Sequence, residues 1–553
     1  MRLAPFALAG SIAAVALATM PGAGPVAATA PAAPLVTAPY LQLGDTFDRA
    51  SLAVVWHQAT GTAPATVEWR RDDGHGGPAG TAGAGGVAPA DAAAGNAAAA
   101  APVARDAAWR PVPLPARLDL PDRVVYTATL DVGRDGGAFR YRLRDQGTTI
   151  VEATGLAPSR PGAPIRFAVI GDTGDGGPDQ RAVASRLLAE HARQPLAFTL
   201  LTGDLVYDCG LRAEYDRSFF PVFNGDDPDG GTTGRSGGVP LMRTVPFVGA
   251  AGNHDVGDKG FWIFDRCAPD YAYLDFWRHP PGFMGAVPIA RDRAPERPAS
   301  GARVVAADLP AALARANFSF TWGDVHVTVL DSNRDVDWAA PALRAWLDRD
   351  LAAARGSRWR VVALHHPPFH FSDTHREQQW TRALAPVFER HGVALVLAGH
   401  VHNFQWFGPA RFTPDPSALD AFAAGVRGRL PGRATLAPSP DGTPVRVADG
   451  PVYVVTGAGG HDLKDQRMRC PADLRPEPPA CLEGPAVNGR EPSVTVIEPA
   501  RSAYSVRSPP PDVSCSREFR AGGIVEDSRR PARRRGRATS RPPPRDPPRY
   551  VRP

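Results

Sequence analysis

Five apolar segments of this chain each lead into a short polar cluster, and this repeated pattern limits the possible fold more than any other feature. In open α/β sheets, ligands collect at the carboxyl ends of the strands, so five such clusters predict one shared site. The glycines in the clusters give the backbone the sharp departure that turns a side chain inward. The five junctions are Arg166–Ile170 before Gly171-Asp172-Thr173-Gly174, Ala197–Leu201 before Gly203-Asp204-Leu205-Val206-Tyr207, Pro246–Ala250 before Gly252-Asn253-His254-Asp255, Val361–Leu364 before His365-His366-Pro367-Pro368, and Val393–Leu397 before Gly399-His400-Val401-His402.

The residue types in these clusters indicate a metal site. Two Asp, one Tyr, one Asn and three His give a mixed oxygen and nitrogen set without thiolate, which suits iron, zinc or manganese better than calcium. Seven ligands are too many for one tetrahedral zinc, so two cations that share a bridging carboxylate fit better. One cluster alone is a weak signal, whereas five in order at strand ends are a strong one. The candidates are Asp172, Asp204, Tyr207, Asn253, His365, His400 and His402.

The length of 553 residues exceeds what one hydrophobic core usually supports and predicts two folded domains. Over 36–160, short alternating segments predict a small antiparallel sandwich, interrupted at 73–107 by a flexible stretch of Gly and Ala. Over 161–505, apolar strands alternate with helical patterns, which predicts a layered α/β domain with packing helices at Asp337–Arg355 and Glu377–His391. The strands expected in the sandwich are Ser51–Trp56, Ala65–Arg70, Val124–Leu130 and Phe139–Leu143.

Both ends of the chain are expected to lie outside these domains. Residues 1–28 have the basic start, apolar run and small residues of a cleaved secretory signal, and no longer apolar run predicts a transmembrane segment. Export, to the cell surface, the periplasm or the medium, means an oxidising compartment. There the five cysteines could form up to two disulfides, with Cys470 and Cys481 as a local pair. Residues 506–553 are rich in Arg and Pro and are expected to be disordered.

The positive charge of the chain is concentrated in this tail. The formal net charge is +5, but 13 arginines against 5 acidic residues lie between Arg507 and Pro553, which leaves the rest of the chain slightly acidic. The folded part therefore gives no indication of a specific nucleic-acid partner. An unstructured terminus of biased composition is the simplest interpretation of the tail, and a weak electrostatic contact with anionic cell-surface polymer is the functional one.

The order of the motifs resembles that of a known family. Gly-Asp-x-Gly, Gly-Asp-x-x-Tyr, Gly-Asn-His, Val-x-x-His and Gly-His-x-His are similar to the motifs of the purple acid phosphatases, within the calcineurin-like metallophosphoesterases. The wider superfamily usually has Asp-x-His in the first motif, so Gly174 at that third position and Tyr207 in the second motif single out the purple branch. The resemblance implies a layered α-β-β-α catalytic domain, and the sandwich before it resembles the fibronectin-type domain of plant-like members.

The resemblance also divides the seven candidates between two metals. It implies that Asp204 bridges a first metal, typically ferric iron, and a second, divalent one, which could be Zn, Mn or Fe. The first metal would have the terminal ligands Asp172, Tyr207 and His402, and the second would have Asn253, His365 and His400.

Four further histidines lie in or near the motifs. His254 resembles the non-ligating histidine that the family places near the leaving group, and His375, ten residues after His365, resembles another outer-sphere histidine. His366 and His370 match no ligand position, and we interpret them as residues behind the ligands or at the surface.

The activity that this resemblance implies is hydrolysis of phosphomonoesters at acidic pH by attack of a metal-bound hydroxide, because ferric iron acidifies bound water more than a divalent ion does. The second metal and the outer histidines would bind phosphate oxygens and protonate the departing alkoxide. A phosphodiesterase or nucleotide pyrophosphatase with the same centre is the enzymatic alternative, since the motifs leave the leaving group open. A non-catalytic cell-surface binding protein is the alternative from another class.

Overall fold

The structure is a computed structural model that describes residues 35–72, 108–226, 237–257, 270–284, 286, 309–436, 445–446, 449–463, 474–475, 493–499, 503–507 and 521–525. The expected signal at 1–28, the insertion at 73–107 and the expected pair of Cys470 and Cys481 lie outside the described residues. Cys209 is disulfide-bonded. Within the part of the chain that is described, no helix is long and apolar enough to cross a membrane.

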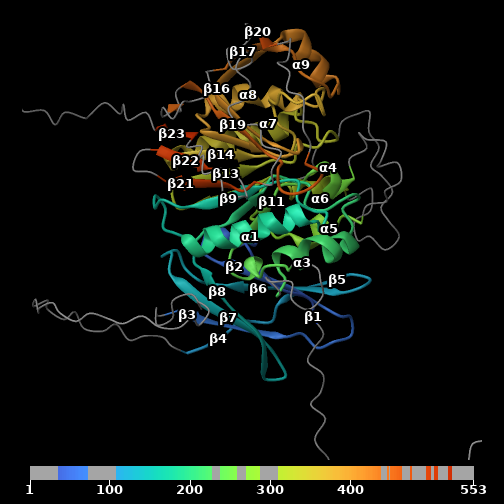
Figure 1. The fold of residues 1–553 in the computed structure, drawn as a ribbon, viewed down its shortest axis with the longest axis vertical. Coiled ribbons are helices and arrows are strands. Elements are labelled where there is room, and N and C mark those ends of the chain that lie inside the picture. The colour runs from blue at the N-terminus through green and yellow to red at the C-terminus, as the bar shows by residue number, and fades with distance from the viewer. Residues whose placement is uncertain are drawn as a thin grey trace, which may run out of the picture.

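The N-terminal part is a sandwich of two four-stranded antiparallel sheets, drawn at the lower end of Figure 1. Alternate side chains of each strand face inward, so Val54 and Trp56 of one sheet share a core with Phe139 and Tyr141 of the other. One sheet has the order β1 (Leu35–Gln42), β2 (Leu52–Gln58), β6 (Val124–Leu130), β5 (Ala116–Asp119), and the other β4 (Arg110–Pro111), β3 (Thr66–Arg71), β7 (Ala138–Asp145), β8 (Thr148–Leu156).

Two larger mixed sheets form the C-terminal part, stacked through a shared apolar core that includes Val169 and Leu200 of the first sheet and Val361 and Leu397 of the second. The first sheet has the order β11 (Phe247–Gly249), β10 (Thr199–Leu201), β9 (Phe167–Ile170), β21 (Thr495–Pro499), β22 (Ala503–Arg507), β23 (Ala521–Val525), β18 (Val445–Arg446). The second has the order β12 (Phe318–Trp322), β13 (Val325–Val329), β14 (Trp359–Ala363), β15 (Leu395–Ala398), β19 (Val452–Thr456), β16 (Phe404–Pro414), β17 (Gly432–Leu436), β20 (Leu474–Arg475).

Helices cover the outer faces of both sheets. Leu187 of α1 packs in one cluster with Ile170 of the first sheet, and Leu347 of α7 belongs to the same cluster with Val362 of the second. The mixed α/β architecture expected from the sequence is therefore confirmed. The helices are α1 (Pro178–Arg193), α2 (Arg212–Glu214), α3 (Phe220–Phe223), α4 (Asn253–Val256), α5 (Ala272–Phe276), α6 (Leu309–Ala314), α7 (Pro341–Ala353), α8 (Ala385–Arg390) and α9 (Pro416–Ala423).

Two sequence-based expectations about regular structure need correction. The helix expected over Glu377–His391 becomes α-helical only at Ala385, because Pro386 has no N–H and its ring would clash with the carbonyl of an earlier turn. The disorder expected throughout 506–553 does not hold at Ala521–Val525, which forms β23 beside β22 and β18. That stretch lacks the arginines and prolines that surround it, so it can join a sheet.

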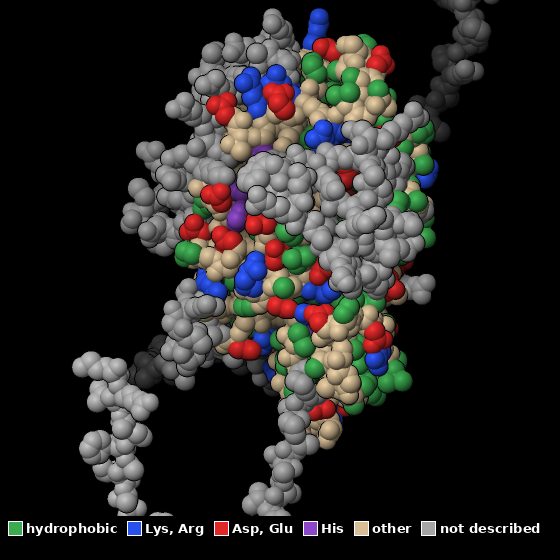
Figure 2. Space-filling model, turned by 90° about the vertical axis from the view of Figure 1, so that its right-hand side faces the viewer, with side chains coloured by type: hydrophobic (Ala, Val, Ile, Leu, Met, Phe, Trp, Pro, Cys, Tyr) green, Lys and Arg blue, Asp and Glu red, His purple; other side chains and the backbone are tan. Residues whose placement is uncertain are grey.

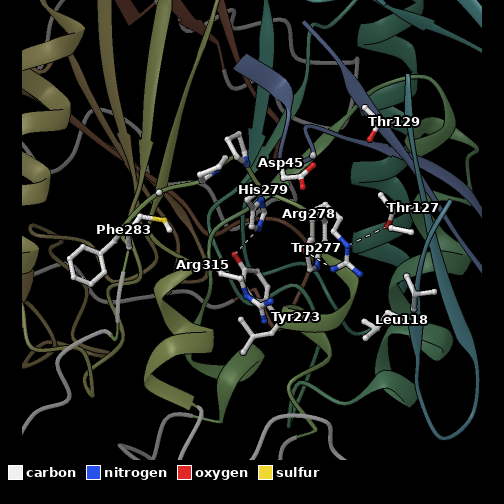
Figure 3. A pocket seen from close by; sticks show the side chains of 18 of the residues that line it. Asp45, Leu118, Thr127, Thr129, Tyr273, Trp277, Arg278, His279, Phe283 and Arg315 are labelled. Carbon is white, nitrogen blue, oxygen red and sulfur yellow. Dashed lines mark hydrogen bonds between the residues drawn. The ribbon is translucent and has the colours of Figure 1, made fainter. Parts of the chain in front are cut away.

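The sandwich meets the C-terminal part through the sheet that contains β1, β2 and β6. Tyr40 and Val55, on the outward face of that sheet, belong to the same apolar cluster as Phe276 of α5. A cavity of about 570 Å³ also lies at this seam, between sandwich residues such as Thr127 and residues of the C-terminal part such as Arg278. Arg278 Nε lies 3.4 Å from Thr127 Oγ1 across it (Figure 3). None of the seven ligand candidates lines this cavity.

Candidate metal centre

The seven candidate ligands lie together at one edge of the two stacked sheets. Strands β9, β10 and β11 are parallel to one another, and so are β14, β15 and β19, so the loops that follow them emerge at their carboxyl ends. Backbone hydrogen bonds tie these loops together: Gly171 N–H donates to Thr456 O at 3.0 Å, and Gly399 N–H donates to His365 O at 3.0 Å. Six of the seven candidates are buried, and His402 is half-buried.

One half of the cluster is built around the Tyr207 hydroxyl. That oxygen lies 3.3 Å from Asp172 Oδ1, 3.3 Å from Asp204 Oδ2 and 3.5 Å from His402 Nε2. His402 Nε2 also lies 3.5 Å from Asp172 Oδ1. Four side chains from three different loops therefore aim ligand atoms at one small space.

The other half is built around His365. Its Nε2 lies 2.9 Å from Asn253 Oδ1, 3.2 Å from His400 Nδ1 and 3.3 Å from Asp204 Oδ2. The same carboxylate oxygen of Asp204 thus belongs to both halves. This arrangement matches a bridging role for Asp204 between two adjacent cations.

Oxygen acceptors hold the second nitrogen of each of the three candidate histidines. A carbonyl oxygen can only accept a hydrogen bond, so the nitrogen that faces it carries the proton in the neutral ring, and the other nitrogen turns a lone pair toward the cluster. The three contacts are His365 Nδ1 to Thr202 O at 2.8 Å, His402 Nδ1 to Asp462 O at 3.3 Å, and His400 Nε2 to the side-chain oxygen of Gln378.

This assignment places acceptors against acceptors. In the neutral ring, the lone pair of His365 Nε2 faces the Asn253 amide oxygen and the Asp204 carboxylate, so either a proton or a cation has to lie between them. Burial disfavours a charged His365, but Asp204 outweighs it and raises the pKa of His365 to about 9. Burial also raises the pKa of Asp172 well above its ordinary value, and Asp204 adds to the effect. A buried set of this kind attracts positive charge, so these residues fit metal cations.

Three candidate ligands have strained backbones. Asp172, Asp204 and His400 have φ values of 58°, 52° and 70°, in the left-handed region that residues other than glycine rarely adopt. Such strain is retained where the surroundings impose it, most often at functional sites. The neighbouring glycines are required for space as well as for turning: a Cβ at Gly203 would lie 2.5 Å from His365 Nδ1, and a Cβ at Gly399 would lie 2.5 Å from Asp172 Oδ2.

The two histidines expected outside the ligand set both border the centre. His254 Nδ1 lies 2.8 Å from Asp208 O, and its Nε2 lies 4.0 Å from Asp204 Oδ2, with 16% of the side chain exposed. The ring of half-buried His375 lies 4.2 Å from that of His400. Figure 2 shows histidine side chains gathered at one place on a face of the molecule, beside acidic side chains.

His366 and His370 are each only 1% exposed, so a surface position is wrong for both. The ring of His366 lies 4.3 Å from that of His400, behind the ligand set. Its ligand atoms also come within 4.8 Å of those of His365 and His400, a spacing that a metal site could use. However, His366 Nδ1 lies 3.2 Å from Ser332 Oγ, and this contact accounts for one of its two ring nitrogens.

Sequence reasoning missed a sixth loop at the centre. Strand β19 leads into Gly457-Ala458-Gly459-Gly460-His461-Asp462, and the rings of His461 and Tyr207 are stacked with centroids 3.5 Å apart. An apolar strand that ends in a glycine-rich polar cluster is the same pattern as in the other five motifs, so the signal was present. The sequence analysis also missed Gln378. The contact of the Thr202 carbonyl with His365 could not be predicted from the residue type, because every residue has a backbone carbonyl.

A family model described as calcineurin-like phosphoesterase matches residues 165–404, a segment that includes all seven candidates. The chain therefore contains a calcineurin-like phosphoesterase domain, which supports the activity of a metal-dependent phosphoester hydrolase. Two uncharacterized proteins of Mycobacterium tuberculosis, MT2654 and Rv2577, are each 29% identical to the chain over 224 residues. These alignments span 35% of this chain and only 37% of each relative.

Two solved structures resemble the chain as well. The purple acid phosphatase PPD1 from seeds of yellow lupin (Lupinus luteus) gives a TM-score of 0.53 at 15% identity, over 91% of this chain and 76% of that chain. PhoD gives a TM-score of 0.48 at 13% identity, over 87% of this chain and 88% of that chain. At 15% identity the lupin structure shows a shared fold and no more.

Proposed function

We propose that this chain is an exported acid phosphatase of the purple type, which hydrolyses phosphomonoesters with ferric iron and a divalent metal, either Zn, Mn or Fe. The observation that carries the proposal is the position of the Tyr207 hydroxyl, 3.3 Å from both Asp172 and Asp204. Burial raises the pKa of Tyr207 well above its ordinary value, and the two carboxylates add to the effect. A phenol kept among carboxylates in this way favours a strongly charged cation as its partner.

In this proposal the seven side chains divide between two cations as the distances group them. Tyr207, Asp172 and His402 hold the first, while Asn253, His365 and His400 hold the second, and Asp204 bridges. The bound metals would supply an acidified water and neutralise the charge on the phosphoryl group.

The two outer histidines act on the substrate. Because His254 Nδ1 faces the carbonyl of Asp208, one proton stays there, and the doubly protonated ring would give its second proton from Nε2 to the departing alkoxide and return to the neutral form. His375, whose ring lies beside that of His400, binds a phosphate oxygen from the other side. Both are partly exposed, as residues that meet a substrate must be.

Two further observations support the proposed setting. The disulfide at Cys209 is consistent with an oxidising compartment and hence with export. The antiparallel sandwich ahead of the catalytic part is consistent with the fibronectin-type domain that precedes the catalytic domain in plant-like members.

Elemental analysis and visible absorption of the purified protein test the proposal. We expect iron and a visible band from tyrosine bound to ferric iron. Tyr207→Phe should abolish the band and weaken metal binding by about 10–100-fold. Tyr453→Phe is the matched control, because the buried Tyr453 hydroxyl makes no hydrogen bond within the described residues. A colourless protein without iron would contradict the ferric centre.

Substrate preference is tested by comparing monoester and diester model substrates across pH. Faster hydrolysis of monoesters at acidic pH is expected. Faster hydrolysis of diesters would favour a phosphodiesterase or nucleotide pyrophosphatase. A protein that holds anionic polymer but hydrolyses neither ester would favour a cell-surface binding protein.

A further inference from the structure

Tyr207 needs external support to act as a ligand. Its phenol oxygen stands at the end of a long side chain that rotates about two bonds, so the position of the oxygen depends on what holds the ring. The ring of His461 lies parallel to it, with centroids 3.5 Å apart and an angle of 16° between the planes. The ring of His254 also contacts it, but at 4.3 Å and 53°. The flat contact with His461 is the one that fixes the plane of the phenol.

His461 is itself anchored to the first motif. Its backbone N–H donates to Asp172 O at 3.0 Å, and its Nδ1 lies 3.5 Å from Asp175 Oδ2. Asp175 is in turn held by Gly177 N–H, which donates to Asp175 Oδ1 at 2.6 Å. The histidine therefore connects the Tyr207 ring to the loop that contains Asp172.

The loop of residues 457–462 also contacts His402, the remaining candidate ligand of the first metal. The carbonyl of Asp462 lies 3.3 Å from His402 Nδ1 and so fixes the tautomer and direction of that ring. Residues 457–462 thus contact Asp172, Tyr207 and His402, the three terminal ligands assigned to the first metal.

We infer that His461 is a positioning residue for the first metal: its ring stack holds the Tyr207 oxygen in place, and the loop of residues 457–462 is a sixth element of the site. The inference rests on the proposed function, since it takes Tyr207 as a ligand. It assigns no proton transfer to His461 and no contact with the substrate. What His461 contributes is a flat surface at a fixed distance, so another flat ring should replace it and a rounded side chain should not.

Two variants distinguish the effect of a flat ring at position 461 from the effect of side-chain volume. His461→Phe keeps a flat ring, whereas His461→Leu fills similar space without one. We expect His461→Leu to shift or weaken the visible band and to release iron to a chelator about 10–100-fold more readily, as loss of a supporting contact to a metal ligand typically does. His461→Phe keeps the stacked ring but loses the contact with Asp175, so it should stay closer to the parent protein than His461→Leu in both measurements.

His279→Leu is the control, because half-buried His279 stacks on Phe318 with centroids 4.0 Å apart and an angle of 11°, away from the centre. It removes a histidine stack without touching the metal ligands, and it should leave the band unchanged. An unchanged band and iron retention in His461→Leu would overturn the inference. Equal losses in His279→Leu would overturn it too, because the effect would then be general destabilisation.

A second metal keeps this test independent of ferric iron. If the parent protein contains no iron, the ferric centre fails on its own, and the same variants are loaded with Co²⁺ and followed by its visible absorption. His461→Leu should then weaken one of two Co²⁺ sites by about 10–100-fold and leave the other unchanged. Equal Co²⁺ binding by the parent protein and His461→Leu would overturn the positioning role whatever metal is native.

Discussion

The seam between the sandwich and the catalytic part and the metal centre both bury polar side chains, but they satisfy them in opposite ways. At the seam, charges are matched: Arg123, 4% exposed, places Nη1 2.8 Å from Asp216 Oδ1 and Nε 2.9 Å from Asp122 Oδ2. At the centre, a neutral His365 ring turns its lone pair toward oxygens that can only accept, so the cluster holds together only with a proton or a cation between them.

The polar cluster at the seam is therefore satisfied within the folded chain, whereas the cluster at the centre needs a bound proton or cation to be satisfied. Buried charges are tolerated when donors meet acceptors, as they do around Arg123. Acceptors that meet acceptors are tolerated when something positive lies between them. The seam should therefore tolerate loss of one charge with a small decrease in stability, whereas the centre should lose its chemistry.

Matched carboxyl-to-amide variants test this comparison with the largest expected effect. Asp204→Asn replaces the one carboxylate shared by both halves of the centre with a neutral amide. We therefore expect kcat/KM for a phosphate ester to fall by about a thousandfold or more, the equivalent of several kcal/mol. Asp216→Asn makes the same chemical change at the seam and should leave kcat/KM unchanged.

The stability of the same two variants sharpens the contrast. Asp216 is 36% exposed and Arg123 keeps its contact with Asp122, so Asp216→Asn should lower the free energy of unfolding by only about 1 kcal/mol. Full activity in Asp204→Asn, or its loss in Asp216→Asn, would show that the two clusters are not distinct in the way described.

A smaller effect is expected at Gln378, whose side-chain oxygen accepts from His400 Nε2. Gln378→Ala removes that acceptor and should weaken binding of the second metal by about 10–100-fold, because the His400 ring is no longer held in one tautomer. Gln378→Glu keeps an acceptor and should retain most of the affinity. The measurement is the Kd of the divalent metal by competition with a chelator, and equal values for the Ala variant and the parent protein would show that other contacts orient His400.

The five motif loops could be predicted from the sequence because each has a local pattern, an apolar strand followed by polar residues. Parallel strands then bring their carboxyl ends to one edge, so local patterns add up to a site. His461 follows the same pattern, five residues after β19 ends at Thr456, and was missed although the signal was present. Gln378 could not have been predicted, since the segment around it gave only a helical pattern.

The fold was predictable at the level of layers and less so at the level of elements. The alternation of apolar and polar residues predicted both ends of the strand Val124–Leu130 correctly. This strand lies between two others in one sheet, and its two faces differ in burial. Strand β1 at Leu35–Gln42 was not expected, as its burial pattern does not alternate. The helix expected over Glu377–His391 was too long because its apolar residues keep the helical spacing on both sides of Pro386, whereas proline cannot stand in the interior of an α-helix.

The smallest expected effect is a pH dependence at the seam. His57 has no exposed surface and lies between the hydroxyls of Thr37, at 2.9 Å, and Tyr40, at 3.0 Å. Burial lowers the pKa of His57 well below its ordinary value, and the positive charges of Arg123 and Arg278 add to the effect. The folded protein therefore keeps His57 neutral at pH values where the unfolded chain, with a histidine pKa near about 6.5, takes up a proton.

That difference in proton uptake determines whether the free energy of unfolding rises or falls with pH. Below about pH 6.5 the unfolded state binds the extra proton, so His57 makes the free energy of unfolding fall as the pH falls, by up to about 1.4 kcal/mol per pH unit. His57→Gln cannot take up that proton, so its stability relative to the parent protein should rise between about pH 6.5 and pH 4.5 in urea unfolding. A constant difference across that range would mean that the folded seam accepts the proton, and the seam would then resemble the metal centre in attracting positive charge.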